Sequence, residues 1–196
     1  MTGVQTCALP ISFPCTAGDV HGKGIDFTST RKISATDYEN LCKSGCKAEK
    51  DDVLLVKDGA TTGRVGLMID DYPCVLLSSV AMLRTNSQTK ATFLMYLLES
   101  MIVQHQINVA MAGSAMPRIT LTKINKFLGI LLPLSEQQQI ATYLDNKCSQ
   151  IDSLIALKQT KIDELKSFKK SLIYEYVTGK KTVPEKIGRA SCRERV

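Results

Sequence analysis

The residues with the types and spacing most suited to chemistry form a glycine-bracketed loop, Gly59-Ala-Thr-Thr-Gly63, between Lys57 and Arg64. Glycines, hydroxyls and cations in one loop suggest a cradle for phosphate. A P-loop, however, needs the pattern G-x4-G-K-[ST] at the start of a helix, whereas the residues after Gly63 have the apolar pattern of a strand. The loop therefore does not predict a nucleotide site.

Cationic and hydrogen-bonding side chains recur after a small-residue loop with the sequence AGSAM at positions 112–116. Such side chains can position a protein on DNA phosphates, and Arg or Lys can also bond the edge of guanine. The candidate DNA-contacting residues in the two loops are Lys57, Thr61, Thr62, Arg64, Ser114, Arg118 and Lys123. On residue chemistry alone, a solvated hairpin tip and a loop that enters a strand are the simpler interpretation.

Patterns for catalysis and metal binding are missing from the sequence. Cys42 and Cys46 form a C-x3-C pair without a second pair, and His21 and His105 are isolated, so a set of four zinc ligands is not indicated. Neither histidine has the neighbours of a catalytic triad. The segment Glu164-Leu-Lys166 fits only the end of a nuclease motif. We expect no catalytic residue, no metal and no cofactor in this chain.

The elements that must position the two loops are predicted to include both strands and helices. Val53–Lys57 and Arg64–Ile69 are expected to form a hairpin, because an Asp-Gly pair lies between two apolar runs. Cys74–Arg84 is a further β-rich run. Ala91–Asn108 has the period of an amphipathic helix, whose predicted buried side is Phe93, Leu94, Leu97, Leu98, Met101 and Ile102.

The segments on either side of this region have weaker patterns. A short helix is expected to start within residues 33–38, capped by Ser34 or Thr36, and residues 118–123 and 127–132 are expected to be strand-like. Strands grouped with one helix and followed by a long helix predict an α+β fold. We therefore expect an irregular, β-rich domain over residues 13–133 and a long helical spacer over residues 134–181.

The spacer is the strongest single prediction. Ser135 is a suitable N-cap, Gln138 would complete a capping box behind Pro133, and Gly179 is a stop signal. No Gly or Pro interrupts the run to Val177, so a helix of roughly 43 residues would be about 65 Å long.

Apolar residues on this helix alternate in steps of four and three, which predicts a coiled-coil partner. Lys158 and Lys169 interrupt the seam and suit a two-helix contact in which long side chains can reach water. The alternative is a helix that lies along its own domain. The predicted interface residues, called the seam below, are Leu144, Cys148, Ile151, Ile155, Ile162, Leu165, Leu172 and Tyr176.

Composition sets wider limits. The 196 residues leave room for one domain and a spacer, and no apolar run is long enough to span a membrane, so a cytoplasmic protein is expected. Residues 1–12 and 187–196 resemble translated sequencing-adapter sequence and are expected to be non-native. The second of these ends supplies two of the six net positive charges, which weakens the indication of an acidic partner.

Four segments in order resemble the specificity subunit of type I restriction–modification systems. They are DVLLVKDGATTGRVG at 52–66, LSSVAMLR at 77–84, GSAMPRIT at 113–120 and PLSEQQQIA at 133–141. Residues 151–181 are similar to the helical spacer of that family, so the resemblance covers roughly residues 13–186.

The resemblance implies a non-catalytic subunit that recognises double-stranded DNA. In that family two target-recognition domains each read half of a split site, and two antiparallel helices fix the distance between them and dock the methyltransferase and restriction subunits. This sequence has one recognition domain and one spacer, so it corresponds to a half-size subunit or to the C-terminal half of a larger one. The partner of the seam would be an equivalent helix from a second copy or from the other half. The alternative from the residues is a coiled-coil assembly protein whose β-rich domain binds protein rather than DNA.

Overall fold

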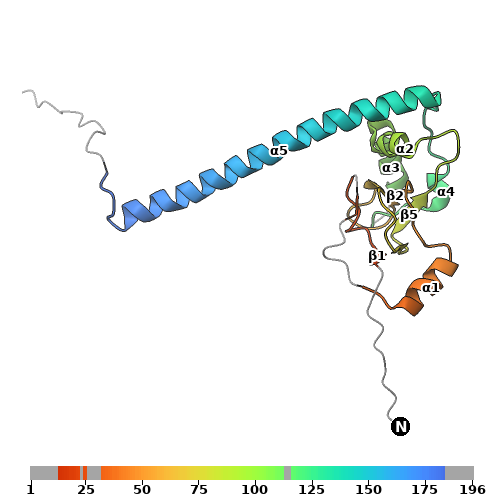
Figure 1. Ribbon diagram of the computed structural model, residues 1–196, viewed down its shortest axis with the longest axis horizontal. Coiled ribbons are helices and arrows are strands. Elements are labelled where there is room, and N and C mark those ends of the chain that lie inside the picture. Colours follow the sequence, from red (N-terminus) through yellow and green to blue (C-terminus); the bar gives the residue numbers. More distant parts are fainter. Residues whose placement is uncertain (1–12, 23, 26–31, 113–115, 184–196) are drawn as a thin grey trace, which may run out of the picture. The chain divides into compact units, whose positions relative to one another are not determined.

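The computed structural model describes residues 13–22, 24–25, 32–112 and 116–183 (Figure 1). The chain divides into two compact units, one ending at Tyr143 and the other beginning at Leu144. We call the first unit the head. The order of strands, short helices and one long helix confirms the predicted α+β class. The 13 residues at the C-terminal end and the first 12, both expected to be non-native in whole or part, lie outside the described residues.

A three-stranded antiparallel sheet with the order β3-β2-β5 forms the centre of the head. The predicted hairpin is confirmed as β2 (Val53–Val56) and β3 (Val65–Leu67), with Val53 opposite Leu67. The fully apolar sequence of β2 reflects cover on both faces. Val53 and Leu55 enter one core cluster, whereas Leu54 and Val56 enter the other.

The predicted β-rich run 74–84 splits into two strands that belong to different sheets. β4 (Cys74–Leu76) pairs in parallel with β1 (Phe13–Cys15), while β5 (Val80–Leu83) pairs with β2. The turn between β4 and β5 contains Ser78 and Ser79, at the polar break in the sequence pattern.

A buried carboxylate fixes the chain where it enters β2. Asp52 is 1% exposed and accepts two 2.9 Å hydrogen bonds from Arg84, one from Nε and one from an Nη nitrogen, and a 2.7 Å bond from the Glu49 N–H. The hydrogen bond and the charge of Asp52 raise the pKa of Arg84 above its usual value. Because a buried charge needs a partner and full hydrogen bonding, this pair fixes the register of β2 against the end of β5.

The first helix agrees with its sequence signals. α1 (Ala35–Lys43) begins after Ser34, whose hydroxyl accepts the Asp37 N–H at 3.2 Å. This is one of the two N-caps that the sequence offered, and a serine in this position satisfies a helix N–H that has no other partner.

The single helix predicted over residues 91–108 is wrong. The structure has α2 (Ala91–Glu99) and α3 (Met101–Met111), separated at Ser100, whose ψ of 149° is extended. The Ser100 hydroxyl and N–H both donate to the Leu97 carbonyl, at 2.6 and 3.1 Å, so they compete with the regular helix ladder. The change of direction also leaves Met101 and Ile102 exposed, against their predicted burial.

The two strand-like segments before the spacer are also wrong. Residues 118–123 contribute only an isolated bridge at Arg118 and then α4 (Leu121–Ile124), which is capped by Thr120. Residues 127–132 form no strand, and the side chain of Gln106 takes up both backbone groups of Leu128. A strand needs a neighbouring edge with free backbone groups, and a short apolar run cannot show whether one is available.

The long helix is confirmed as α5 (Leu134–Val177), a single unbroken element (Figure 1). Its first backbone bond runs from the Gln137 N–H to the Pro133 carbonyl, so Pro133 and not Ser135 occupies the N-cap position. The predicted capping box is therefore wrong, and the Gln138 amide bonds Thr142 instead. The predicted stop is right, since Gly179 has a φ of +71°. Among the described residues, no helix combines the length and the apolar character that crossing a membrane requires.

Gln137 joins the start of α5 to the head. Its side chain is fully buried and all three of its hydrogen bonds are to backbone groups. The amide oxygen accepts the Lys90 N–H at 2.8 Å, and the amide nitrogen donates to the carbonyls of Gln88 at 2.9 Å and Leu132 at 2.7 Å. The first turn of α5 is thus bonded to the turn that leads into α2.

Candidate nucleic-acid interface

The two loops predicted to contact DNA lie side by side in the head. Asp58 and Arg118 form an antiparallel bridge, the Gly59 N–H donates to the Pro117 carbonyl at 3.0 Å, and the Ile119 N–H donates to the Lys57 carbonyl at 2.8 Å. Residues 57–64 and 117–119 therefore form one surface, called the paired loops below. Sequence reasoning had kept them as separate clusters.

One carboxylate organises the cations of the paired loops. Asp58 lies 2.9 Å from Lys57 Nζ through Oδ2 and 3.0 Å from Arg118 Nε through Oδ1. The contact with Arg118 is an ion pair that lacks the alignment of a hydrogen bond. Asp58 was missed as a site residue, although the sequence Lys57-Asp58 places the two charges next to each other.

The exposure of the two cations separates their roles. Lys57 is 15% exposed, whereas Arg118 is 68% exposed and contacts Asp58 through Nε. Because the ion pair uses Nε, the two terminal nitrogens of the Arg118 guanidinium remain exposed to solvent. These nitrogens form a fork that can donate to two acceptors of guanine or of a phosphate. Lys57 is instead a partner of Asp58 within the loop.

The remaining candidates of the first loop bond inward. Thr62 donates to the Gly59 carbonyl at 2.6 Å, and the longer contacts of Thr61 and Arg64 with the carbonyls of Ala17 and Val20 are both 3.4 Å. These three side chains are half-buried. They support the shape of the loop, and their predicted contact with DNA stays a prediction.

The loop is anchored to α3 through Gln104, a residue that the sequence did not single out. Its amide nitrogen donates to the carbonyls of Gly63 at 2.9 Å and Leu98 at 2.8 Å. Gly63 has a φ of +95°, and a Cβ added there would lie 3.1 Å from the Gln104 side chain and 3.2 Å from Ile107. Because Gln104 and Gly63 are 41 positions apart, no local pattern could reveal this contact.

The last two candidates stand apart from the paired loops in different ways. Lys123 is exposed and its ammonium donates to the Ala110 carbonyl at 2.6 Å, at the end of α3. A cation at this position also interacts favourably with the helix dipole. Ser114 lies outside the described residues, so its predicted role stays a prediction.

The residues that the structure describes do not bring together side chains for metal binding or thiol catalysis. Within residues 13–22, 24–25, 32–112 and 116–183, no group of three or more His, Cys, Asp or Glu side chains could hold a metal ion. Cys15 and Cys74 are buried, and the pKa of the Cys15 thiol is raised by its hydrogen bond with Cys74 and by burial. A raised pKa disfavours the nucleophilic thiolate.

The predicted seam of α5 lies along the surface of that helix. Its residues from Ile151 to Leu172 are 37–58% exposed, while Leu144, Cys148 and Tyr176 are half-buried. A regular row of exposed apolar side chains is what an unpaired coiled-coil helix presents. Whether a second helix covers it stays a prediction.

Comparison with known proteins decides the family. A sequence model described as the type I restriction modification DNA specificity domain matches residues 16–167, which is more than three quarters of the chain. The chain belongs to this family of type I restriction–modification DNA specificity domains. The family is defined by DNA specificity and not by catalysis, which agrees with the prediction that this chain is not itself an enzyme. The match extends through both members of the paired loops and most of α5.

Two solved structures support the fold. The HsdS subunit from Thermoanaerobacter tengcongensis has 16% identity and a TM-score of 0.58, with 89% of this chain and 45% of that chain covered. A chain from work on complex assembly and conformational transition of the type I R-M system has 23% identity and a TM-score of 0.54, with 65% and 30% covered. The specificity domain thus spans less than half the length of either. A search of curated protein sequences gave no match.

Proposed function

We propose that this chain is a DNA-recognition module of a type I specificity subunit, and that its head reads one half of a split site in double-stranded DNA. The observation that carries the proposal is the family match over residues 16–167. The paired loops give it a physical basis, because they bring an exposed arginine fork and a half-buried supporting lysine to one place. In this role the chain acts in the cytoplasm, and methylation and cleavage belong to partner chains.

We propose further that α5 pairs through its seam with an equivalent helix, from a second copy or another half of the same subunit. A stiff helix of 44 residues can hold two recognition heads at a fixed separation, so the spacing of the half-sites becomes part of the recognised sequence. The methyltransferase and restriction subunits would then assemble around the paired helices.

Within the head, Arg118 is the residue we assign to direct DNA contact. Asp58 holds its Nε, so the fork is oriented before DNA arrives and less conformational entropy is lost on binding. A bidentate contact with a base is worth about 1–3 kcal/mol of discrimination. Lys57, Thr61, Thr62 and Arg64 would act through the shape of the loop.

The experiment is a salt titration of DNA binding by the full chain together with a type I methyltransferase subunit, on DNA selected from a random library. The proposed function predicts sequence-selective binding that weakens as salt rises. Arg118→Lys keeps the charge but not the fork, so it should retain salt dependence and lose discrimination at one position by about tenfold or more. Lys43→Arg, which also keeps the charge at an exposed cation on α1, is the matched control.

Two results would contradict these assignments. Binding to protein without any salt-dependent binding to DNA would favour the alternative, a coiled-coil assembly protein with a protein-binding head. Unchanged base preference in Arg118→Lys would remove Arg118 from base recognition while leaving the family function intact. Lys123→Ala separates the remaining candidate, because a phosphate contact predicts equal weakening on all sequences.

A further inference from the structure

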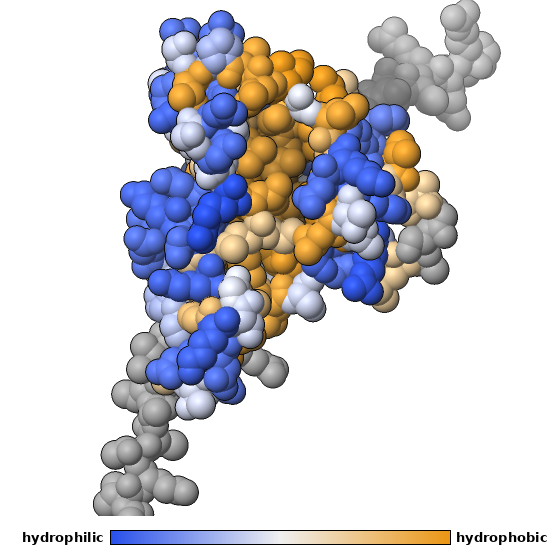
Figure 2. Space-filling view, turned by 90° about the vertical axis from the view of Figure 1, so that its right-hand side faces the viewer, coloured by the Kyte–Doolittle hydropathy of each residue, from blue (hydrophilic) through white to orange (hydrophobic). Residues whose placement is uncertain are grey.

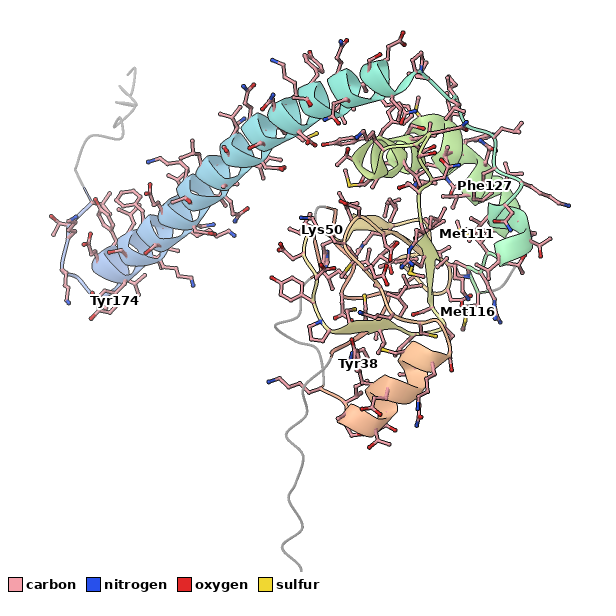
Figure 3. The ribbon with its side chains drawn as sticks, turned by 45° about the vertical axis from the view of Figure 1, so that its right-hand side comes forward. Tyr38, Lys50, Met111, Met116, Phe127 and Tyr174 are labelled. Atoms are coloured by element: carbon pink, nitrogen blue, oxygen red, sulfur yellow. The ribbon has the colours of Figure 1, made fainter. Side chains whose placement is uncertain are left out.

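A groove between α3 and the chain around α4 is lined by apolar side chains together with lysines. It has a volume of about 530 Å³. Val109, Ala110 and Phe127 are its apolar residues, and the side chains with a positive or titratable nitrogen are His105, Lys123 and Lys126. Figure 3 shows Phe127 between α4 and the α2–α3 helices. We call it the α3–α4 groove.

The apolar surface continues from the groove along the chain that leads to α5. Leu128, Ile130 and Leu131 are 78%, 60% and 64% exposed, and Val109 is 61% exposed. Figure 2 shows an apolar band on the face of the head that carries α4 and this segment, with hydrophilic margins on both sides. Adjacent, highly exposed apolar residues on one face are typical of an interaction surface, whereas single ones are ordinary.

The backbone beside the groove is already satisfied, which limits how a partner can bind. The Leu128 N–H donates to Gln106 Oε1 at 2.8 Å, and the Leu128 carbonyl accepts from Gln106 Nε2 at 2.9 Å. An added strand would need such groups free to form a ladder. At Leu128 the surface therefore presents its side chain and not free backbone groups, and an apolar surface beside two helical elements suits the apolar face of a helix.

The charges of the groove define the chemistry of that helix. No Asp or Glu is among the residues that line it in the described part of the chain, and two lysines stand beside the apolar residues. Duplex DNA would satisfy the lysines but gain little from covering Phe127 and Leu128, since its outer surface is phosphate and sugar. A protein helix with carboxylates beside an apolar face satisfies both, as in interfaces with an apolar centre and a polar rim.

We propose that the α3–α4 groove binds an acidic amphipathic helix of a second protein. Apolar side chains spaced at i, i+3 and i+7 would cover Val109, Phe127 and Leu128, and carboxylates flanking them would meet Lys123 and Lys126. The surface shares Lys123 with the candidate DNA contacts but includes neither Arg118 nor a residue of the paired loops, and the peptide test below is carried out without DNA.

The test uses the full chain and two fluorescent 18-residue helical probes with identical leucine positions, one flanked by glutamates and the other by lysines. Fluorescence anisotropy should show the glutamate probe binding about tenfold or more tightly than the lysine probe. Lys126→Glu should reduce or reverse the preference for the glutamate probe. Val109→Asp should lower the affinity for both probes at least tenfold. Both residues are exposed, and circular dichroism checks that the variants fold. Leu157→Asp, at an apolar residue of similar exposure on α5, is the matched control.

Each other outcome overturns the proposal. Equal binding of both probes, no binding of either, or binding that Val109→Asp leaves unchanged would show that the groove is not the site. Displacement of the glutamate probe by a 20-base-pair duplex, with the duplex itself losing affinity in Val109→Asp, would assign the groove to DNA. Loss of self-association in Val109→Asp, measured by sedimentation, would assign it to a second copy of this chain.

Discussion

Gln137→Ala removes the side chain that bonds the first turn of α5 to the head. Three backbone groups lose their partner together, namely the Lys90 N–H and the carbonyls of Gln88 and Leu132. A hydrogen bond contributes about 1 kcal/mol net, and a buried group left without a partner costs about 1–3 kcal/mol. Because Gln88 and Lys90 lie near solvent, water can replace part of the loss. We expect the free energy of unfolding of the head to fall by about 3 kcal/mol, roughly a hundredfold in the folding equilibrium.

A second substitution at the same position separates hydrogen bonding from volume. Gln137→Glu keeps the acceptor for Lys90 but turns a carboxylate oxygen toward two carbonyl oxygens. Burial and these oxygens would raise the pKa of the introduced carboxyl above about 4.3, its value in an unfolded chain. The protonated carboxyl is the form that stabilises the folded chain, and its contribution to the free energy of unfolding is fully present below about pH 4.3. This contribution is lost as the pH rises through the pKa of the carboxyl in the folded state. The deficit of Gln137→Glu relative to the native chain should therefore shrink between pH 7 and pH 4.5.

The assay combines urea unfolding with hydrogen exchange of the Lys90 amide, which reports the bond directly. Gln138→Ala is the control, because Gln138 is exposed and bonds only Thr142, at 3.3 Å, among the contacts described. If Gln137→Ala shows the same urea midpoint and the same Lys90 exchange rate as Gln138→Ala, the buried amide does not hold the start of α5, and the reasoning fails.

Three further predictions follow from packing and exposure. Gly63→Ala should destabilise the head by about 2 kcal/mol in urea unfolding, because its φ is +95° and the added Cβ would lie 3.1 Å from a neighbouring side chain; an unchanged midpoint would contradict this. Ile155→Asp should weaken helix association at least tenfold in sedimentation, whereas Leu157→Asp, also exposed but outside the seam, should not. Cys15 should resist alkylation in the native protein while half-buried Cys148 reacts, read by peptide mass spectrometry, since the hydrogen bond with Cys74 and burial raise the pKa of the Cys15 thiol.

The features that sequence reasoning predicted correctly depend on local patterns. The apolar run of β2 and the Asp-Gly turn after it are recognised from a few neighbouring residues. The length of α5 is recognised from a continuous run without Gly or Pro. The break at Ser100 was missed because neither Gly nor Pro marks it, and only the hydroxyl contact with Leu97 reveals why the helix ends there. The strand expected over residues 127–132 failed for a related reason, since Gln106 occupies the backbone groups that pairing would need.

The candidate site was predicted in composition but not in arrangement. The sequence supplied both loops and their cations, yet the bridge between Asp58 and Arg118 is a long-range contact with no local signal. The same limit applies to Gln104, whose importance depends on Gly63. Residue types thus indicated what the surface could bind. Only the fold showed that the Arg118 side chain is exposed to solvent, whereas the Lys57 side chain is half-buried.

The long-range closure of the paired loops has a consequence for how the head folds. Thr62 and the Pro117 carbonyl that it contacts are separated by 55 positions, with β3, β4, β5, α2 and α3 between them. Contacts between distant positions form slowly, because the intervening chain must first be ordered. During synthesis the hairpin can form early, but the surface around Arg118 cannot close until α3 and residue 119 have left the ribosome. We expect this surface to be the last part of the head to form and, in native-state exchange, among the first to open.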